Sequence, residues 1–234
     1  LMERLERLFG DIRFWIAITF VHRLASIMQP PLEVAHNWRQ TTVTMVARNF
    51  LEIDPNIFYP RVDMAGDLWG ITGMEFPLLN YLIYLVSLIF GYEHWYGRLI
   101  NLIISSTGIW CFYDVIKHYF NKKVAFASAM VLLFSLFYYY SRKVMPDTFS
   151  VSLIFAGIWV WKDFVLTSKF WKYLLGSLLI ALGVLSKLPS VMILAFLWPL
   201  ILEANWTKRL LMSSAIGMAG VAAALWYFYW VTYL

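Results

Sequence analysis

Three polar segments interrupt the otherwise apolar first part of the chain: "HNWRQ" (36–40), "FYPRVD" (58–63) and "GMEFPLLNYL" (73–82). They contain His36, Asp63 and Glu75, side chains that can take a proton from an attacking hydroxyl. A second set of residues, mostly cations, could hold a phosphate and stabilise the charge that grows on it as it leaves. These candidate substrate-binding residues are Arg39, Gln40, Arg61, Arg142, Lys143, Asp147, Lys187 and Arg23. Together the two sets predict the transfer of a group from a phosphate to a hydroxyl.

Several of these residues also have a structural interpretation, which the sequence leaves open. His36 could satisfy the groups at a helix end, and Glu75 and Asp147 could be acids favoured at helix starts by the helix dipole. Lys187 could extend from a membrane span towards the interface. Arg23 lies deeper in an apolar segment, where charges tend to mark function, although it could reach the interface.

The sequence predicts neither a resident metal centre nor a soluble nucleotide substrate. No His or Cys stands at a metal-binding spacing near His36, although a divalent cation bound with the substrate stays open. There is no glycine-rich phosphate loop, and the basic connections contain no Asp-x-Asp motif. The phosphate would therefore come from a lipid.

The composition is that of a polytopic membrane protein. Hydrophobic residues make up 61% of the 234 residues, aromatic residues 19%, and the mean hydropathy is +0.66. The formal net charge of +5 does not indicate nucleic-acid binding, because the cations are spread over the ends of apolar segments. We therefore expect an all-α fold with membrane lipids around it.

The apolar runs predict about seven transmembrane helices, near residues 12–30, 96–117, 124–141, 146–164, 172–187, 189–203 and 209–231. The connections 117–123, 161–172 and 203–209 carry seven Lys and one Arg, which predicts that they are cytoplasmic. The N-terminus would then also be cytoplasmic, and the loop 32–76 would lie outside.

The first outer region, residues 32–95, should contain helices that lie beside the membrane. Residues 36–52 have apolar side chains at the spacing of an amphipathic surface helix. Residues 77–90 are apolar but too short for a span, so we expect a helix that dips into the outer leaflet. Residues 1–234 read as a single transmembrane module, and the Leu at position 1 leaves open that this is the N-terminal module of a longer protein.

The segments "HNWRQTTVTMVARNF", "FYPRVD", "GMEFPLLNYLIYL" and "YGRL" closely resemble GT-C membrane glycosyltransferases. The resemblance is to the bacterial branch related to dolichyl-phosphate-mannose protein mannosyltransferases and the aminoarabinose transferase of lipid A. It covers about residues 11–200 and is densest at 36–100. It implies a location in the bacterial inner membrane, a polyprenyl-phosphate sugar as donor, and inversion at the anomeric carbon.

One departure from the family pattern affects the expected catalytic base. Many relatives have an Asp-Glu pair early in the first outer loop, where this chain has His36 and Asn37. Glu33, Asp63, Glu75 or His36 could replace that acid, or the protein could be inactive. We expect Glu75 to be the base, with a pKa raised by partial burial, and Asp63 to be a weaker base because of Arg61 beside it.

The predicted function is therefore an integral-membrane glycosyltransferase that acts at the outer face. It would transfer a sugar from a polyprenyl-phosphate carrier to a lipid, glycan or protein hydroxyl. The alternative is a non-catalytic GT-C-like subunit that binds lipid and packs in a larger membrane complex. A transporter is a more distant alternative, because it would need a site at the membrane midplane.

Overall fold

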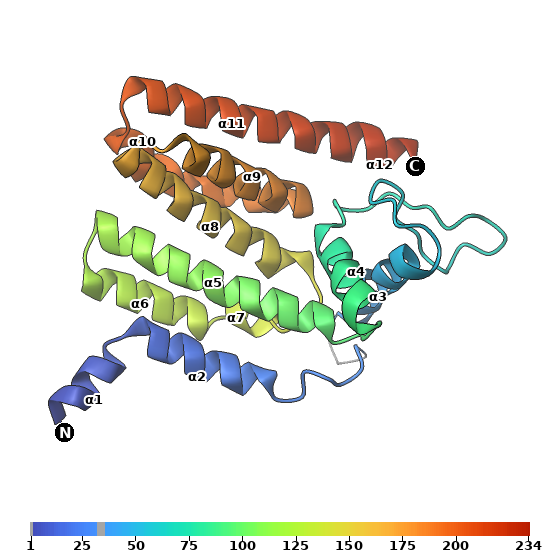
Figure 1. Ribbon diagram of the computed structural model, residues 1–234, viewed down its shortest axis with the longest axis horizontal. Helices are drawn as coiled ribbons and strands as arrows, with labels where there is room; N and C mark the ends of the chain where they lie inside the picture. Colours follow the sequence, from blue (N-terminus) through green and yellow to red (C-terminus); the bar gives the residue numbers. More distant parts are fainter. Residues whose placement is uncertain (1, 32–35) are drawn as a thin grey trace.

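The computed structural model describes residues 2–31 and 36–234, and these residues are almost entirely helical or in irregular connections (Figure 1). Within the described ranges no strand forms, apart from one isolated bridge between Arg61 and Ile71. The α-helices are α1 (Met2–Phe9), α2 (Ile12–Leu24), α3 (Asn37–Glu52), α4 (Leu78–Phe90), α5 (Tyr96–Tyr119), α6 (Lys122–Leu133), α7 (Leu136–Tyr140), α8 (Pro146–Thr167), α9 (Phe170–Ser186), α10 (Trp198–Glu203), α11 (Trp206–Ala224) and α12 (Val231–Tyr233). The 3-10 helix η1 (Leu188–Leu197) precedes α10, and the π-helix η2 (Leu225–Trp230) joins α11 to α12.

The long helices lie side by side with their axes roughly aligned (Figure 1). Helix α11 packs on α9, α9 on α8, α8 on α5, and α5 on both α2 and α6. One end of this layer, which we call the basic end, carries α1 and the turns α5–α6, α8–α9 and α10–α11. The opposite end, which we call the loop end, carries α3, α4 and the irregular residues 53–77. The three basic connections thus share one end, as the sequence predicts.

Three of the described helices are long and apolar enough to cross a membrane: Tyr96–Tyr119, Pro146–Thr167 and Trp206–Tyr233. This confirms a membrane protein with an all-α fold. The count of seven spans, the sidedness of the two ends and the extent of the module stay predictions.

Three predicted spans differ from the elements that form. The first apolar run is helical only to Leu24, and a turn with Ser26 at positive φ follows. The run 124–141 divides into α6 and α7, because Ser135 caps a new helix by accepting a hydrogen bond from the Phe137 amide. The run 189–203 begins as the 3-10 helix η1, with Pro189 in its first turn, and becomes α-helical only in α10.

Close packing of α8 on α9 depends on glycines at their interface. A Cβ on Gly157 would meet the side chain of Ile180, and a Cβ on Gly176 would meet the ring of Trp161. Small residues let helix backbones approach closely where apolar burial alone gives no driving force between helices. This packing fixes the start of α8 relative to the end of α9, both of which belong to the site.

The two helices of the loop end form where the sequence predicts them, and their placement beside the membrane stays a prediction. Val43, Val46, Ala47 and Phe50 are all buried on one face of α3. Helix α4 has 13 residues and is too short to count among the candidate spans. Its Asn80 donates a hydrogen bond of 2.9 Å from Nδ2 to the Val43 carbonyl, which fixes α4 against α3.

Candidate functional site

Glu75 lies at the centre of a cluster of charged side chains at the loop end. Its Oε1 atom accepts hydrogen bonds from the guanidinium of Arg39, in the first turn of α3, and from Lys187, just after α9. The distance from Lys187 Nζ to Glu75 Oε1 is 3.0 Å, and Lys187 Nζ also lies 3.6 Å from Oδ1 of Asp147 in the first turn of α8. Four candidate residues from four separate segments therefore meet here.

The backbone around Glu75 is held in place by distant parts of the chain. The Phe76 amide donates to the Leu185 carbonyl over 3.3 Å, which ties the segment to the end of α9. On the other side, the Trp226 indole donates to the Met74 carbonyl over 2.9 Å. Gly73 lies against the backbone of Val231, where a Cβ would come within 2.5 Å of the carbonyl oxygen. Glu75 is thus positioned by α9 and α11–α12 and is not part of a free loop.

The electrostatics of Glu75 correct one prediction. Burial of the carboxyl raises its pKa, but the hydrogen bonds from Arg39 and Lys187 outweigh burial and hold the pKa below its ordinary value. The expected increase is therefore wrong for this arrangement of side chains, because both cations are already paired with Glu75. In this state Glu75 is an ionised group and a weak base.

Two cavities flank the start of α8. One of about 210 Å³ is lined by Trp38, Arg39, Glu75 and Asn80, with Pro146 on its α8 side. The other, of about 380 Å³, has His36 and Asp147 among mostly apolar side chains such as Leu136, Phe137 and Val151. A hollow lined by two members of the charged cluster, Arg39 and Glu75, and a hollow lined by a third, Asp147, therefore lie on either side of the start of α8.

His36 lies beside Tyr140 at the second cavity. The two rings meet edge to face with centroids 5.4 Å apart, and the Tyr140 hydroxyl is 3.3 Å from His36 Nε2. Asp147 lines the same cavity, and its Oδ2 atom is buried without a hydrogen-bond partner among the described residues. This carboxylate oxygen could accept a hydrogen bond from a substrate hydroxyl.

The sequence predicts that Gln40 binds substrate, but its side chain does not reach either cavity. Its side chain is completely buried, and its Oε1 atom accepts a hydrogen bond of 3.3 Å from the Val144 amide. Lys143 is also buried, and Arg142 donates to the Ala25 carbonyl over 2.7 Å. These contacts connect α3 and the end of α2 to residues 142–144. Arg142 and Lys143 line neither cavity.

Asp63 and Arg61, predicted as neighbours, have other partners. Asp63 pairs with Arg48 and accepts a hydrogen bond of 2.8 Å from Asn49, and Arg61 pairs with Asp54 at 3.3 Å. The hydrogen bond from Asn49, helped by Arg48, holds the pKa of Asp63 below its ordinary value. Asp63 is a weak base as predicted, but Arg61 is not the cause. Neither residue lines the two cavities.

Two candidate residues remain, Arg23 and Glu33. Arg23 stacks over the ring of Tyr139 at 5.2 Å from its centroid. Glu33, one of the alternative acids, falls outside the residues that the structure describes. In those residues no group of three His, Cys, Asp or Glu side chains could hold a metal ion.

Sequence reasoning missed three residues that shape the site. Asn80 and Trp38 line the smaller cavity, and Tyr140 contacts His36. An Asn inside the apolar run 77–90 was a signal for a buried polar contact. Trp38 and Tyr140 gave no comparable signal, because aromatic residues are frequent throughout this chain.

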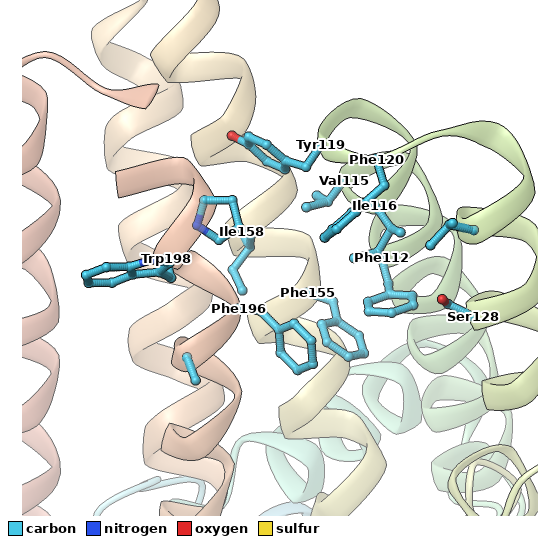
Figure 2. A pocket seen from close by; sticks show the side chains of 13 residues that line it. Phe112, Val115, Ile116, Tyr119, Phe120, Ser128, Phe155, Ile158, Phe196 and Trp198 are labelled. Atoms are coloured by element: carbon cyan, nitrogen blue, oxygen red, sulfur yellow. The ribbon is translucent and has the colours of Figure 1, made fainter. Parts of the chain in front are cut away.

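The largest described cavity is separate from this cluster (Figure 2). It measures about 450 Å³ and lies between α5, α6, α8 and η1–α10, with the rings of Phe112, Phe155 and Phe196 facing it. None of the candidate site residues lines it. Its lining offers no acid or cation for the predicted reaction.

The fold and this cluster define a helical membrane protein with paired acids and cations at one end. The family model of dolichyl-phosphate-mannose-protein mannosyltransferases matches residues 75–233. The chain therefore belongs to this family and is a GT-C-type membrane glycosyltransferase by membership. No curated protein and no solved structure matches the chain. The family match includes Glu75, Asp147 and Lys187, whereas Arg39 and His36 precede it.

Proposed function

We propose that this protein transfers a sugar from a polyprenyl-phosphate carrier to a hydroxyl acceptor, with inversion, at the loop end. The family supports both the reaction class and the lipid-linked type of sugar donor. One observation carries the proposal for the site: Glu75 is hydrogen-bonded to two cations, Arg39 and Lys187, beside a cavity. The cluster would thereby combine a base with a pair of phosphate-binding cations.

The phosphate of the sugar donor would compete with Glu75 for these two cations. Arg39 and Lys187 would rotate towards the phosphate oxygens, because both can make charge-assisted hydrogen bonds to phosphate. Glu75 would then lose the contacts that lower its pKa and keep the burial that raises it. Donor binding would in this way convert Glu75 into an effective base.

In the reaction, the acceptor oxygen forms a bond to the anomeric carbon while the bond from that carbon to the phosphate oxygen breaks. The acceptor proton passes to Glu75, and the electron pair of the broken bond stays on the polyprenyl phosphate. Lys187 and Arg39 stabilise the growing negative charge on that phosphate. Asp147 could orient the sugar through its unpartnered oxygen, and the largely apolar cavity beside His36 suits the first isoprene units of the carrier.

The test uses the purified protein in lipid nanodiscs with a radiolabelled polyprenyl-phosphate sugar. We expect Glu75→Gln to lower turnover by about 10²- to 10⁴-fold, the range for loss of a general base. Donor binding should be kept or become tighter, because the donor phosphate no longer has to displace a carboxylate from Arg39 and Lys187. Glu52→Gln is the matched control, because Glu52 is exposed at the end of α3 and pairs only with Arg48 among described residues. Near-normal turnover of Glu75→Gln would move the base to Asp63 or His36.

The same experiment addresses the non-catalytic alternative. That alternative draws support from the pairing of Glu75 with both cations and from His36-Asn37 in place of an acidic pair. A wild-type protein that binds the polyprenyl-phosphate sugar and transfers none of it to acceptors, including water, would favour a lipid-binding subunit. A mass spectrum of lipids that copurify with the protein would identify the carrier in either case.

A further inference from the structure

A polar cavity of about 410 Å³ is lined by residues of the basic end. This end lies opposite the loop end with α3 and α4 (Figure 1). Three helices form the cavity: the start of α2, the end of α5 and the start of α6. Lys117 and Lys122 line it together with Arg13, and the rings of Trp110 and Tyr113 complete its wall. None of these residues takes part in the proposed transfer.

The carboxylates of this cavity are already neutralised. Arg13 binds Asp11 through a hydrogen bond of 3.0 Å from Nε to Oδ2 and a second one from Nη2. Asp114 pairs with Lys162 and accepts a hydrogen bond of 2.9 Å from the Trp159 indole. In contrast, Lys117 and Lys122 are exposed and make no hydrogen bond or ion pair within residues 2–31 and 36–234. Lys117 and Lys122 still attract Asp114 and Asp11 electrostatically. The lining has three cations and two acids, a net charge of +1, and Lys162, paired with Asp114, adds a positive charge behind it.

An apolar groove continues from this cavity along the bundle. The groove measures about 300 Å³ and shares Arg13 and Trp110 with the polar cavity. Its other lining residues include Ile16, Ala17 and Phe20 of α2, which lie one to two helical turns beyond Arg13. The two hollows together form a positively charged pocket with an apolar extension.

The position of the pocket fits the headgroup level of a membrane. Helix α5 is one of the candidate spans, and Lys117 follows its first residue, Tyr96, by 21 positions. At about 1.5 Å per residue this separation is about 30 Å, which matches the hydrocarbon thickness of a bilayer. Tyr113 and Trp110 precede Lys117 by four and seven residues on α5, so they lie on the apolar side of the lysines, towards the groove.

We propose that this pocket binds an anionic glycerophospholipid. Lys117 and Lys122 would bind its phosphate, with Arg13 at the entrance, and one acyl chain would lie in the groove between α2 and α5. Charge complementarity favours an anionic over a zwitterionic headgroup, because basic pockets between helices attract anionic lipids. The apolar groove distinguishes a lipid from a free phosphate ion.

The charge of the site can be tested by native mass spectrometry of the whole protein in detergent, titrated with phosphatidylglycerol or phosphatidylcholine. We expect retained phosphatidylglycerol and little phosphatidylcholine. Each of Lys117→Gln and Lys122→Gln should weaken phosphatidylglycerol binding about 5-fold. Lys123→Gln is the matched control, because Lys123 is exposed next to Lys122 and lies outside the cavity. Equal binding of the two lipids, or equal losses in Lys122→Gln and Lys123→Gln, would overturn the proposal.

The groove needs its own test, which leaves all cations in place. Ala17→Trp should fill the groove and reduce phosphatidylglycerol binding, whereas Ile18→Trp, on an adjacent exposed position outside the groove, should not. Inorganic phosphate and glycerol phosphate should not raise the unfolding temperature as phosphatidylglycerol does. If they match the lipid, the site takes a free phosphate and the proposal is wrong. Sugar transfer plays no part in these measurements, so their outcome is independent of the proposed activity.

Discussion

Replacing Lys187 with Met removes the cation that joins both acids of the candidate site. Lys187 Nζ lies 3.0 Å from Glu75 Oε1 and 3.6 Å from Asp147 Oδ1. The Met side chain keeps most of the apolar length of lysine, so the packing around the start of η1 should change little. The variant therefore tests the charge and its hydrogen bonds more than the shape of the site.

The expected loss of donor affinity follows from the exchange that donor binding requires, in which Lys187 replaces its hydrogen bond to Glu75 by one to the phosphate. A hydrogen bond to a charged group contributes about 1.5–3 kcal/mol, but Lys187 must give up its bond to Glu75 before it can bind the phosphate. The side chains of Lys187 and Glu75 are 24% and 21% exposed. Solvent therefore weakens only in part the bond from Lys187 to Glu75 and the bond from Lys187 to the phosphate that would replace it. We therefore expect a net loss of about 1–2 kcal/mol in donor binding, or about 5- to 30-fold in Kd.

The assay is equilibrium binding of a radiolabelled polyprenyl-phosphate sugar to the protein in nanodiscs. Lys169→Met is the control, because Lys169 is exposed at the opposite end of the same helix. Thermal unfolding of both variants identifies a general loss of structure. A Kd for Lys187→Met within 2-fold of the wild-type and Lys169→Met values would refute the role of Lys187 in phosphate binding.

The remaining predictions concern pH, the loop, the helix interface and the topology. Because the pKa of Glu75 is lowered in the folded protein, its ionised carboxylate stabilises the fold at any pH above the ordinary pKa of a glutamate. This stabilisation is lost as the pH falls from that value through the lowered pKa. Measurements of unfolding free energy against pH should show this loss in the wild type and not in Glu75→Gln. Asp63→Asn should lower the free energy of unfolding by less than about 1 kcal/mol, since its pair with Arg48 is exposed, and should leave turnover near normal; a large loss of turnover would return Asp63 to the site. Gly157→Leu should destabilise the α8–α9 interface by about 1–3 kcal/mol, whereas Gly217→Leu, with open space around its Cβ position, should not; equal unfolding temperatures would contradict the packing argument. Cysteines placed at positions 121 and 67 should label from opposite sides of intact cells, and labelling from one side would contradict the assignment of the two ends.

The helices of the loop end could be predicted because their signals are local. The apolar spacing within 36–52 and the shortness of 77–90 indicated α3 and α4, which form within a residue of the expected limits. The same periodicity could also have predicted that Gln40 is buried. Gln40, Val43, Thr44 and Ala47 follow the spacing of one helical face, and that face is buried. A polar residue on this face could have been expected inside.

The pairings within the site could be predicted only in part, because they join residues far apart in the sequence. The topology placed Glu75, Asp147 and Lys187 at one end, but their contacts depend on how α8 and α9 pack. Nothing in the sequence could indicate that Arg39 and Lys187 would share one carboxylate oxygen and lower the pKa of Glu75. For Asp63, the neighbouring Arg61 was the obvious partner. The loop instead folds back on α3, so that Asp63 contacts Asn49 and Arg48 of that helix.

The pairing of Glu75 with the phosphate-binding cations also bears on release of the product under the proposed mechanism. The sugar donor is a phosphodiester with one negative charge, whereas the product is a monoester with about 1.5–2 negative charges near neutral pH. Arg39 and Lys187 should therefore bind the product more tightly than the sugar donor. Once Glu75 loses the proton it accepted, its carboxylate competes for both cations and favours departure of the phosphate. On this argument Glu75→Gln should bind polyprenyl phosphate more tightly than the wild type does, and Lys187→Met should bind it more weakly. Binding of radiolabelled polyprenyl phosphate in nanodiscs measures both changes, and an unchanged Kd in Glu75→Gln would rule out this competition.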